Sequence, residues 1–101
     1  DGKIDWATMT ARQIYNMSRA LLPPLYGAFF QFQGRHVILR QCEPLDEALP
    51  LETLNPGTVE FNTSEHLVVV TTDGRLKITH LEDESGADVS FSNFIPGSSF
   101  T

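Results

Sequence analysis

The feature that most constrains this chain is a pair of strand-like segments on either side of the dipeptide Asp73-Gly74. Residues 67–71 are almost entirely apolar, which predicts a central strand covered on both faces. Residues 75–81 alternate between two faces, as a half-buried strand does. One predicted face carries Leu76, Ile78 and His80. Because Asp-Gly suits the tight turn between antiparallel strands, the two segments are predicted to form a β-hairpin.

Other segments with strand character lie on both sides of this hairpin. Residues 28–32 and 35–42 flank Gln33-Gly34 and predict a second hairpin, and residues 58–62 predict a further strand. Residues 89–95 suit either a last short strand or a helical turn. Residues 43–56 hold three prolines and four acidic residues, which predicts a surface connection with one helical turn near residues 46–49.

One amphipathic helix is predicted over residues 6–22. Its apolar stripe, at helical spacing, consists of Ala11, Ile14, Tyr15, Ser18, Leu21 and Leu22. We expect Asp5 or Thr8 to cap its N-terminus, because a short oxygen-bearing side chain can accept a free backbone N–H. Pro23-Pro24 is expected to end it, since neither proline donates a backbone hydrogen bond.

These elements predict a mainly β fold: a small OB-like Greek-key β-barrel of five to six strands with one N-terminal helix. One helix is too few for a doubly wound parallel sheet. A closed barrel also leaves no exposed edge strand to aggregate.

Composition narrows the class of protein. Thirteen acidic residues against seven basic ones give a formal net charge of −6, whereas a dedicated nucleic-acid-binding domain is usually basic. No apolar run is long enough for a membrane span. The single cysteine, Cys42, cannot form an internal disulfide, so an intracellular compartment is expected: the cytoplasm or, as an open alternative, the mitochondrion. The opening Asp1-Gly2, without Met, indicates a piece of a longer protein.

Charge is distributed unevenly along the chain. Eleven of the thirteen acidic residues follow position 42, and five of the seven basic residues precede position 43. Two interpretations stay open: an ordinary solvated surface, or an N-terminal face that meets an anionic partner. The candidate contacts for an acceptor or RNA are Lys3, Arg12, Arg19, Arg35 and Arg40.

No catalytic, cofactor-binding or metal site is predicted from the residue patterns. His36, His66 and His80 match no zinc spacing, and Cys42 has no suitably spaced Cys or His partner. We expect ordinary pKa values for the loop carboxylates Asp83 and Glu84. Phe29, Phe30 and Phe32 beside Arg35 and Arg40 suit either a base-stacking platform or, more commonly for strand aromatics, the core.

Several short motifs, taken together, resemble the C-terminal domain of the folate-dependent formyltransferases. The opening D-G-x-I-D-W at residues 1–6, A-x-x-I-x-x-x-x-R-A at residues 11–20 and P-G-x-V at residues 56–59 resemble this family's pattern. So do the run around Thr71-Thr72-Asp73-Gly74 and the closing Phe94-Ile95-Pro96-Gly97. Tyr26 departs from the pattern, because a proline stands there in the family. The matching residues are scaffold residues, so the resemblance identifies a fold and a lineage.

The resemblance implies an OB-like barrel domain over residues 6–97, a linker from an upstream catalytic domain over residues 1–5, and a tail over residues 98–101. It also implies that a Rossmann-like upstream domain binds 10-formyltetrahydrofolate and carries an Asn-His-Asp set. This chain is then not catalytic alone. The acceptor implied is an amino-sugar nucleotide, whose branch the opening motif resembles, or methionyl-tRNA. An OB-like RNA-binding module that uses the basic N-terminal face is the alternative, and no membrane partner is expected.

Overall fold

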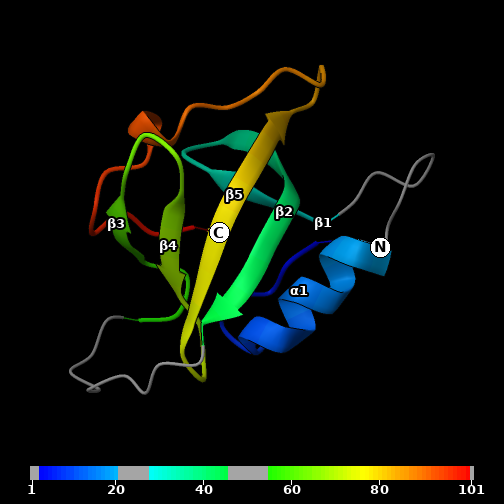
Figure 1. The fold of residues 1–101 in the computed structure, drawn as a ribbon, viewed down its shortest axis with the longest axis vertical. Helices are drawn as coiled ribbons and strands as arrows, with labels where there is room; N and C mark the ends of the chain where they lie inside the picture. Colours follow the sequence, from blue (N-terminus) through cyan, green and yellow to red (C-terminus); the bar gives the residue numbers. More distant parts are fainter. Residues whose placement is uncertain (1–2, 21–27, 46–54, 101) are drawn as a thin grey trace.

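Figure 1 shows the computed structural model of the chain, which describes residues 3–20, 28–45 and 55–100. The fold is mainly β, as predicted, with one α-helix among the described residues. In chain order the elements are α1 (Ala11–Ala20), β1 (Ala28–Phe32), β2 (Arg35–Leu45), β3 (Val59–Asn62), β4 (Leu67–Val70), β5 (Arg75–Asp83) and the 3₁₀ turn η1 (Phe91–Asn93). The helical alternative for residues 89–95 is therefore confirmed.

The described strands form one antiparallel sheet in the order β1-β2-β5-β4-β3. Both predicted hairpins are present. In the β1–β2 turn, Gln33 and Gly34 adopt φ values of 52° and 79°, as the tightest hairpin turns require. In the β4–β5 turn, the Thr71 amide donates to the Gly74 carbonyl at 2.9 Å. All four residues of β4 are buried, which confirms a strand covered on both faces.

Segments near the two ends of the chain cover the edges of this sheet. The Ile4 amide donates to the Phe29 carbonyl at the β1 edge, and the Val59 amide at the β3 edge donates to the Ser98 carbonyl, both at 2.8 Å. The two segments meet where the Trp6 ring packs on Phe100, with ring centroids 5.2 Å apart. This junction links β1 to β3 and gives the sheet the wrapped form of the predicted OB-like barrel.

Within the predicted tail, residue 100 packs into the core. Phe100 is only 6% exposed, and its ring also stacks on Phe30 with centroids 4.2 Å apart. The sequence hides this role because a single aromatic residue follows three small or polar ones. Ile4, within the predicted linker, is 1% exposed and also belongs to the core. The wider division into linker, barrel and tail stays a prediction.

Gly57 permits the close packing at this junction. Its φ is 89°, a backbone conformation that side chains with a Cβ rarely adopt. A Cβ at this position would also lie 3.0 Å from the Trp6 Cβ. The Pro-Gly of the sequence motif therefore serves the docking of the N-terminal segment.

Register shifts between β2 and β5 change which side chains face the core. They lie between Leu39 and Cys42 of β2, around the pairing of Gln41 with His80. Beyond them Cys42 lies on the buried face while Gln41 is exposed, and Leu81 takes the buried place that strict alternation would give His80. A bulge inserts a residue into the alternation, which a period of two cannot anticipate. His80 is thereby turned toward the surface.

Helix α1 begins at Ala11, so the predicted start at residue 6 is wrong. The N-cap is Thr10, not Asp5 or Thr8: the Thr10 hydroxyl accepts from the Gln13 amide at 3.1 Å. The Gln13 side chain accepts from the Thr10 amide at 2.9 Å, which completes a capping box. Residues 6–8 instead form a turn that lets Trp6 reach the core.

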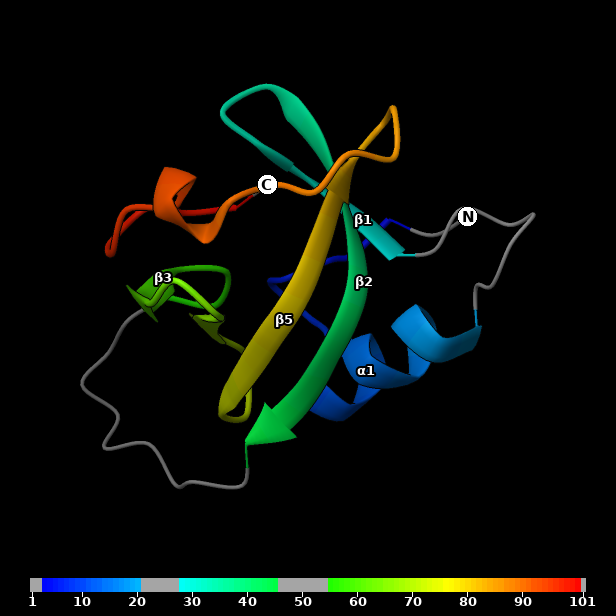
Figure 2. The same ribbon diagram turned by 45° about the horizontal axis from the view of Figure 1, so that its top comes forward.

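The helix packs mainly against β2, as Figure 2 shows. Ala11, Ile14 and Ser18 are buried and Tyr15 is half-buried, as the stripe predicted. The β4–β5 turn holds its N-terminus: Asp73 Oδ1 accepts from the Ala11 amide at 3.0 Å. The Thr72 hydroxyl also donates to the Met9 carbonyl at 3.1 Å.

The core contains most of the predicted strand aromatics. Phe30 and Phe32 are buried against Phe94 and Phe100, so these two are core residues and not a stacking platform. Phe29 is half-buried and stacks on His36, with ring centroids 4.6 Å apart.

Some sequence predictions lie outside the described residues. They concern the stripe residues Leu21 and Leu22, the Pro23-Pro24 helix end, the opening residues 1–2, Tyr26 and the helical turn near residues 46–49.

Candidate functional site

On the exposed face of α1, two predicted contact residues share a neighbour. Arg12 and Arg19 lie one on each side of Tyr15 in the helix, with guanidinium carbons 5.8 Å and 5.4 Å from the ring centroid. Arg19 Nη1 also donates to the Tyr15 hydroxyl at 3.2 Å. Guanidinium groups over an aromatic face keep their charge while losing some conformational freedom. We name Arg12, Tyr15 and Arg19 the helix surface.

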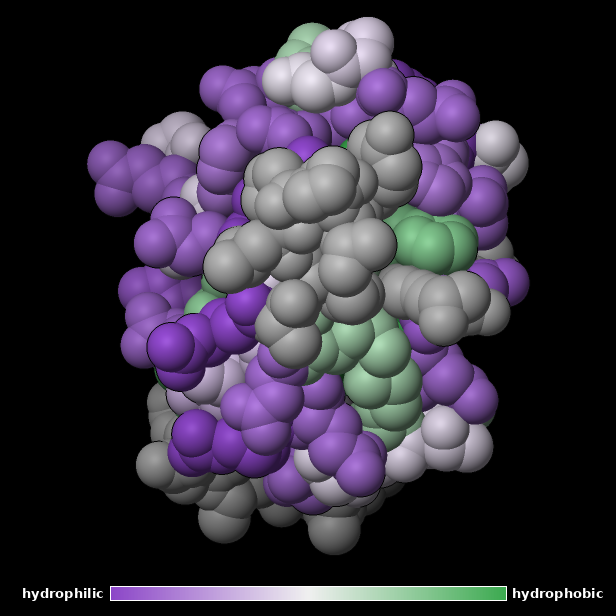
Figure 3. Space-filling model, turned by 90° about the vertical axis from the view of Figure 1, so that its right-hand side faces the viewer, coloured by the Kyte–Doolittle hydropathy of each residue, from purple (hydrophilic) through white to green (hydrophobic). Residues whose placement is uncertain are grey.

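The charge of the helix surface is not offset within its own helix. Residues 11–20 include no acidic residue. Arg19 lies in the last turn, where a cation suits the negative end of the helix dipole. Figure 3 views the side of the molecule where α1 lies and shows a mostly hydrophilic face, with hydrophobic residues bordering those drawn in grey. Such a surface can bind an anionic group such as a phosphate.

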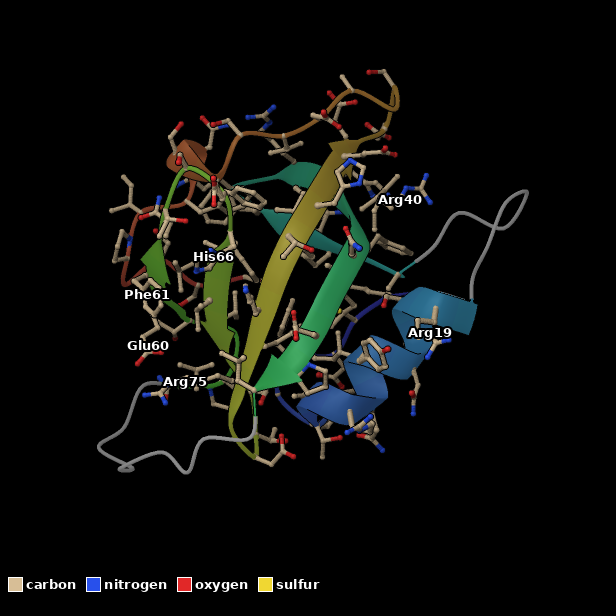
Figure 4. All side chains as sticks on the ribbon, in the orientation of Figure 1. Arg19, Arg40, Glu60, Phe61, His66 and Arg75 are labelled. Atoms are coloured by element: carbon tan, nitrogen blue, oxygen red, sulfur yellow. The ribbon has the colours of Figure 1, made fainter. Side chains whose placement is uncertain are left out.

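Arg40 is bound to an acidic residue instead. Its Nε donates to Glu82 Oε1 at 2.8 Å, and the two side chains are only 26% and 19% exposed. This ion pair joins β2 to β5 and offsets the charge of Arg40. Figure 4 shows Arg40 and Arg19 at separate places on the molecule.

Arg35 also lies beside a carboxylate. It is exposed in the first position of β2. Hydrogen bonds from the Ser85 hydroxyl and the Ala87 amide hold the pKa of Asp83 below its ordinary value, and the charge of Arg35 adds a smaller lowering, so the expectation of an ordinary pKa for Asp83 is wrong. The turn after β5 uses this carboxylate as its anchor, which spacing alone does not reveal.

Lys3 lies apart from these arginines. It is exposed and pairs with Phe29 at the β1 edge. It also borders a cleft of about 510 Å³ lined by Lys3, Ile4, Asp5, Trp6, Ala7, Pro56 and Phe100. The five predicted contact residues therefore divide into the helix surface, two arginines beside acidic residues of β5, and Lys3 at the cleft.

The structure contains two further charged groups that the sequence did not predict. Arg75 of β5 makes a two-point ion pair with Glu60 of β3, across β4, which Figure 4 labels. His80 lies against Glu82 and Asp88. The signal for the second group was present in the sequence as a histidine and a glutamate two residues apart, followed by an aspartate after a turn.

Cys42 has the properties of a core residue rather than of a nucleophile. It is 7% exposed, and this burial raises the pKa of its thiol. Its Sγ lies 3.6 Å from the Ser18 hydroxyl. A protonated, enclosed thiol is a poor nucleophile. No helix in the described part of the chain has the length and apolar character that a membrane span requires.

Comparison with known proteins gives two results. The model of the family described as "Formyl transferase, C-terminal domain" matches residues 1–99. A methionyl-tRNA formyltransferase of Caldicellulosiruptor saccharolyticus is 33% identical to this chain over 100 residues, an alignment that covers 96% of the chain. The chain spans 30% of the length of that relative.

Proposed function

The chain belongs to the family of formyl transferase C-terminal domains, and from this premise we propose that it is the non-catalytic part of a longer formyltransferase. The observation that carries the proposal is the family match over residues 1–99, together with a formyltransferase relative more than three times as long as the matched part. In the parent enzyme, the upstream domain binds 10-formyltetrahydrofolate and transfers its formyl group to an amine. This domain braces the upstream domain and contributes to the acceptor side of the site.

Two features of the described residues support a role without chemistry. The cysteine is enclosed and protonated, and the motif residues that match the family hold turns and packing contacts. Asp73 and Gly57 are examples, since they serve the helix and the Trp6 junction. A domain of this kind positions a partner but provides no nucleophile or base.

The contact we propose for the acceptor is the helix surface. Both acceptors under consideration, methionyl-tRNA and an amino-sugar nucleotide, carry phosphate groups that guanidinium groups bind well. The name of the relative favours methionyl-tRNA. Arg12 and Arg19 provide few cations, so the domain is an auxiliary contact and the main affinity lies elsewhere in the parent enzyme. The alternative of an independent RNA-binding module is weakened because Arg40 and Arg35 lie beside Glu82 and Asp83.

Steady-state kinetics of the parent enzyme test this proposal. Replacing both arginines (Arg12→Gln and Arg19→Gln) should raise the KM for the acceptor about tenfold and leave kcat and the KM for the formyl donor nearly unchanged, because only binding is lost. Arg35→Gln is the matched control and should change none of these three constants. The 101-residue chain alone should form no product. Formylation by the isolated chain would contradict the assignment of chemistry to the upstream domain, and an unchanged acceptor KM would contradict the helix surface.

A further inference from the structure

The hairpin that follows β5 brings one imidazole nitrogen and two carboxylates to a single point. His80 Nε2 lies 2.9 Å from Asp88 Oδ1 and 3.4 Å from Glu82 Oε2. The three ligand atoms lie within 4.8 Å of one another. The geometry points to a binding site for a divalent transition-metal cation, with Zn²⁺ as its natural probe, formed by His80, Glu82 and Asp88.

The backbone places these three side chains independently of any ion. His80 and Glu82 are two residues apart on β5, and Asp88 pairs with Glu82 on the returning segment. The Asp83 amide donates to the Ala87 carbonyl at 2.9 Å, and the Val89 amide donates to the Leu81 carbonyl at 3.0 Å. These bonds on both sides of the pair fix Asp88 opposite Glu82.

The distances between the donor atoms suit a shared ion. Ligands bound about 2.1 Å from one metal at tetrahedral or octahedral angles are about 3.0–3.4 Å apart. Both distances from the His80 nitrogen are close to this range. One imidazole with two carboxylates is a ligand set for Zn²⁺ and similar transition metals, because an imidazole nitrogen binds these metals better than it binds Mg²⁺ or Ca²⁺. On binding, the ion takes the place of the proton between His80 and the carboxylates.

Arg40 supplies the outer contact that metal-binding carboxylates usually have. Its Nε donates a hydrogen bond to Glu82 Oε1, and the second oxygen, Oε2, faces His80. The ion can enter from solvent, because the side chains of Asp88 and His80 are 83% and 40% exposed. Two carboxylates against one guanidinium leave a net negative charge, which attracts a cation. The site uses no residue of the helix surface, so its test and the test of the proposed function are independent of each other.

Calorimetric titration of the 101-residue chain with ZnCl₂, together with NMR of its histidine side chains, tests the site. We expect one ion per chain and a shift of the His80 ring signals. His80→Gln and Asp88→Asn should each weaken binding by at least about tenfold, because each removes a ligand. His66→Gln is the matched control: this histidine contacts Thr63, outside the cluster, and its loss should leave the affinity unchanged.

Loss of zinc binding by a variant can be distinguished from misfolding of that variant. Asp88 is the most exposed ligand, so Asp88→Asn should retain the circular dichroism spectrum and thermal midpoint of the wild type. The proposal is overturned by an absence of saturable binding up to about 0.5 mM Zn²⁺. It is equally overturned by binding that survives both ligand substitutions, or by binding that His66→Gln abolishes.

Discussion

The arginines of the helix surface and those of β2 that lie near β5 have different surroundings. On α1, Arg12 and Arg19 flank Tyr15 and have no acidic residue within their helix. On β2, Arg40 is bound to Glu82, and Arg35 lies beside Asp83. No acidic residue of the helix offsets the first group, whereas the ion pair of Arg40 with Glu82 joins β2 to β5. A count of charges along a sequence cannot make this distinction, because pairing depends on the fold.

The junction at Phe100 belongs to the core that underlies the sheet, and removing it should have the largest effect on stability. Phe100→Ala deletes ring contacts with Trp6, Phe30 and Phe94 and should lower the free energy of unfolding by about 3–5 kcal/mol. Chemical denaturation measures the loss. Ile95→Ala is the control, because Ile95 is 64% exposed and should cost less than about 0.5 kcal/mol. A loss below about 1 kcal/mol for Phe100→Ala would show that residues 98–100 are a tail after all.

Substitution of Asp73 should destabilise the start of α1 and leave the hairpin after β5 unaffected. Asp73→Ala removes the acceptor for the Ala11 amide and should cost about 1–2 kcal/mol, as loss of a helix cap does. Amide hydrogen exchange should speed up in the first turn of α1 and stay unchanged at Val89, in the hairpin. Asp73→Asn keeps the oxygen acceptor and should behave nearly as the wild type. Equal loosening of both regions would contradict the separation.

The ion pair of Arg40 should have a smaller effect. Arg40→Gln leaves Glu82 without this ion-pair partner and should cost about 0.5–1 kcal/mol, as expected for a pair that solvent still reaches in part. Arg12→Gln should change stability by less than about 0.5 kcal/mol, since Arg12 is exposed and, among the described residues, its guanidinium lies over the Tyr15 ring. Paired denaturation curves of the two variants test this order. If Arg12→Gln proves the more destabilising, the two surfaces have been assigned the wrong roles.

Lowering the pH should destabilise the turn after β5, because it protonates the Asp83 carboxylate. The pKa of this carboxylate is lowered in the folded state, so its stabilising effect is present above the unfolded pKa and is lost as pH falls through the folded pKa. The difference in thermal midpoint between wild type and Asp83→Asn should therefore shrink as pH falls from about 6 toward 3. A difference that is constant over this range would show that the carboxylate charge has no part in holding the turn.

Local patterns predicted the elements of the fold better than their ends. The Asp73-Gly74 and Gln33-Gly34 hairpins, the buried β4 and the buried stripe of α1 follow from periodicity and turn chemistry. The helix start was missed because Trp6 and Ile14 suit one helical stripe, whereas the capping box of Thr10 and Gln13 decides the boundary. The bulge near Gln41 and the burial of Phe100 depend on contacts between distant segments, which no local window contains.

For the candidate surfaces too, the sequence predicted local features but not the contacts between distant segments. The sequence selected Arg12 and Arg19 together with Arg35 and Arg40, but only the fold shows that Glu82 binds Arg40 and that Asp83 lies beside Arg35. The cluster of His80, Glu82 and Asp88 was missed because a zinc search by spacing looks for cysteines and paired histidines. The β-bulge turns His80 outward, and the tight return brings Asp88 opposite Glu82.

The most direct test is an NMR titration of the ¹⁵N-labelled chain with methionyl-tRNA and, separately, with an amino-sugar nucleotide. The account predicts that one of them shifts the signals of Arg12, Tyr15 and Arg19, with signals of residues 80–88 unchanged. For two phosphate contacts, log affinity should fall with log salt at a slope of about −1.4 to −1.8. Shifts centred on the hairpin, or no shift with either acceptor, would contradict it.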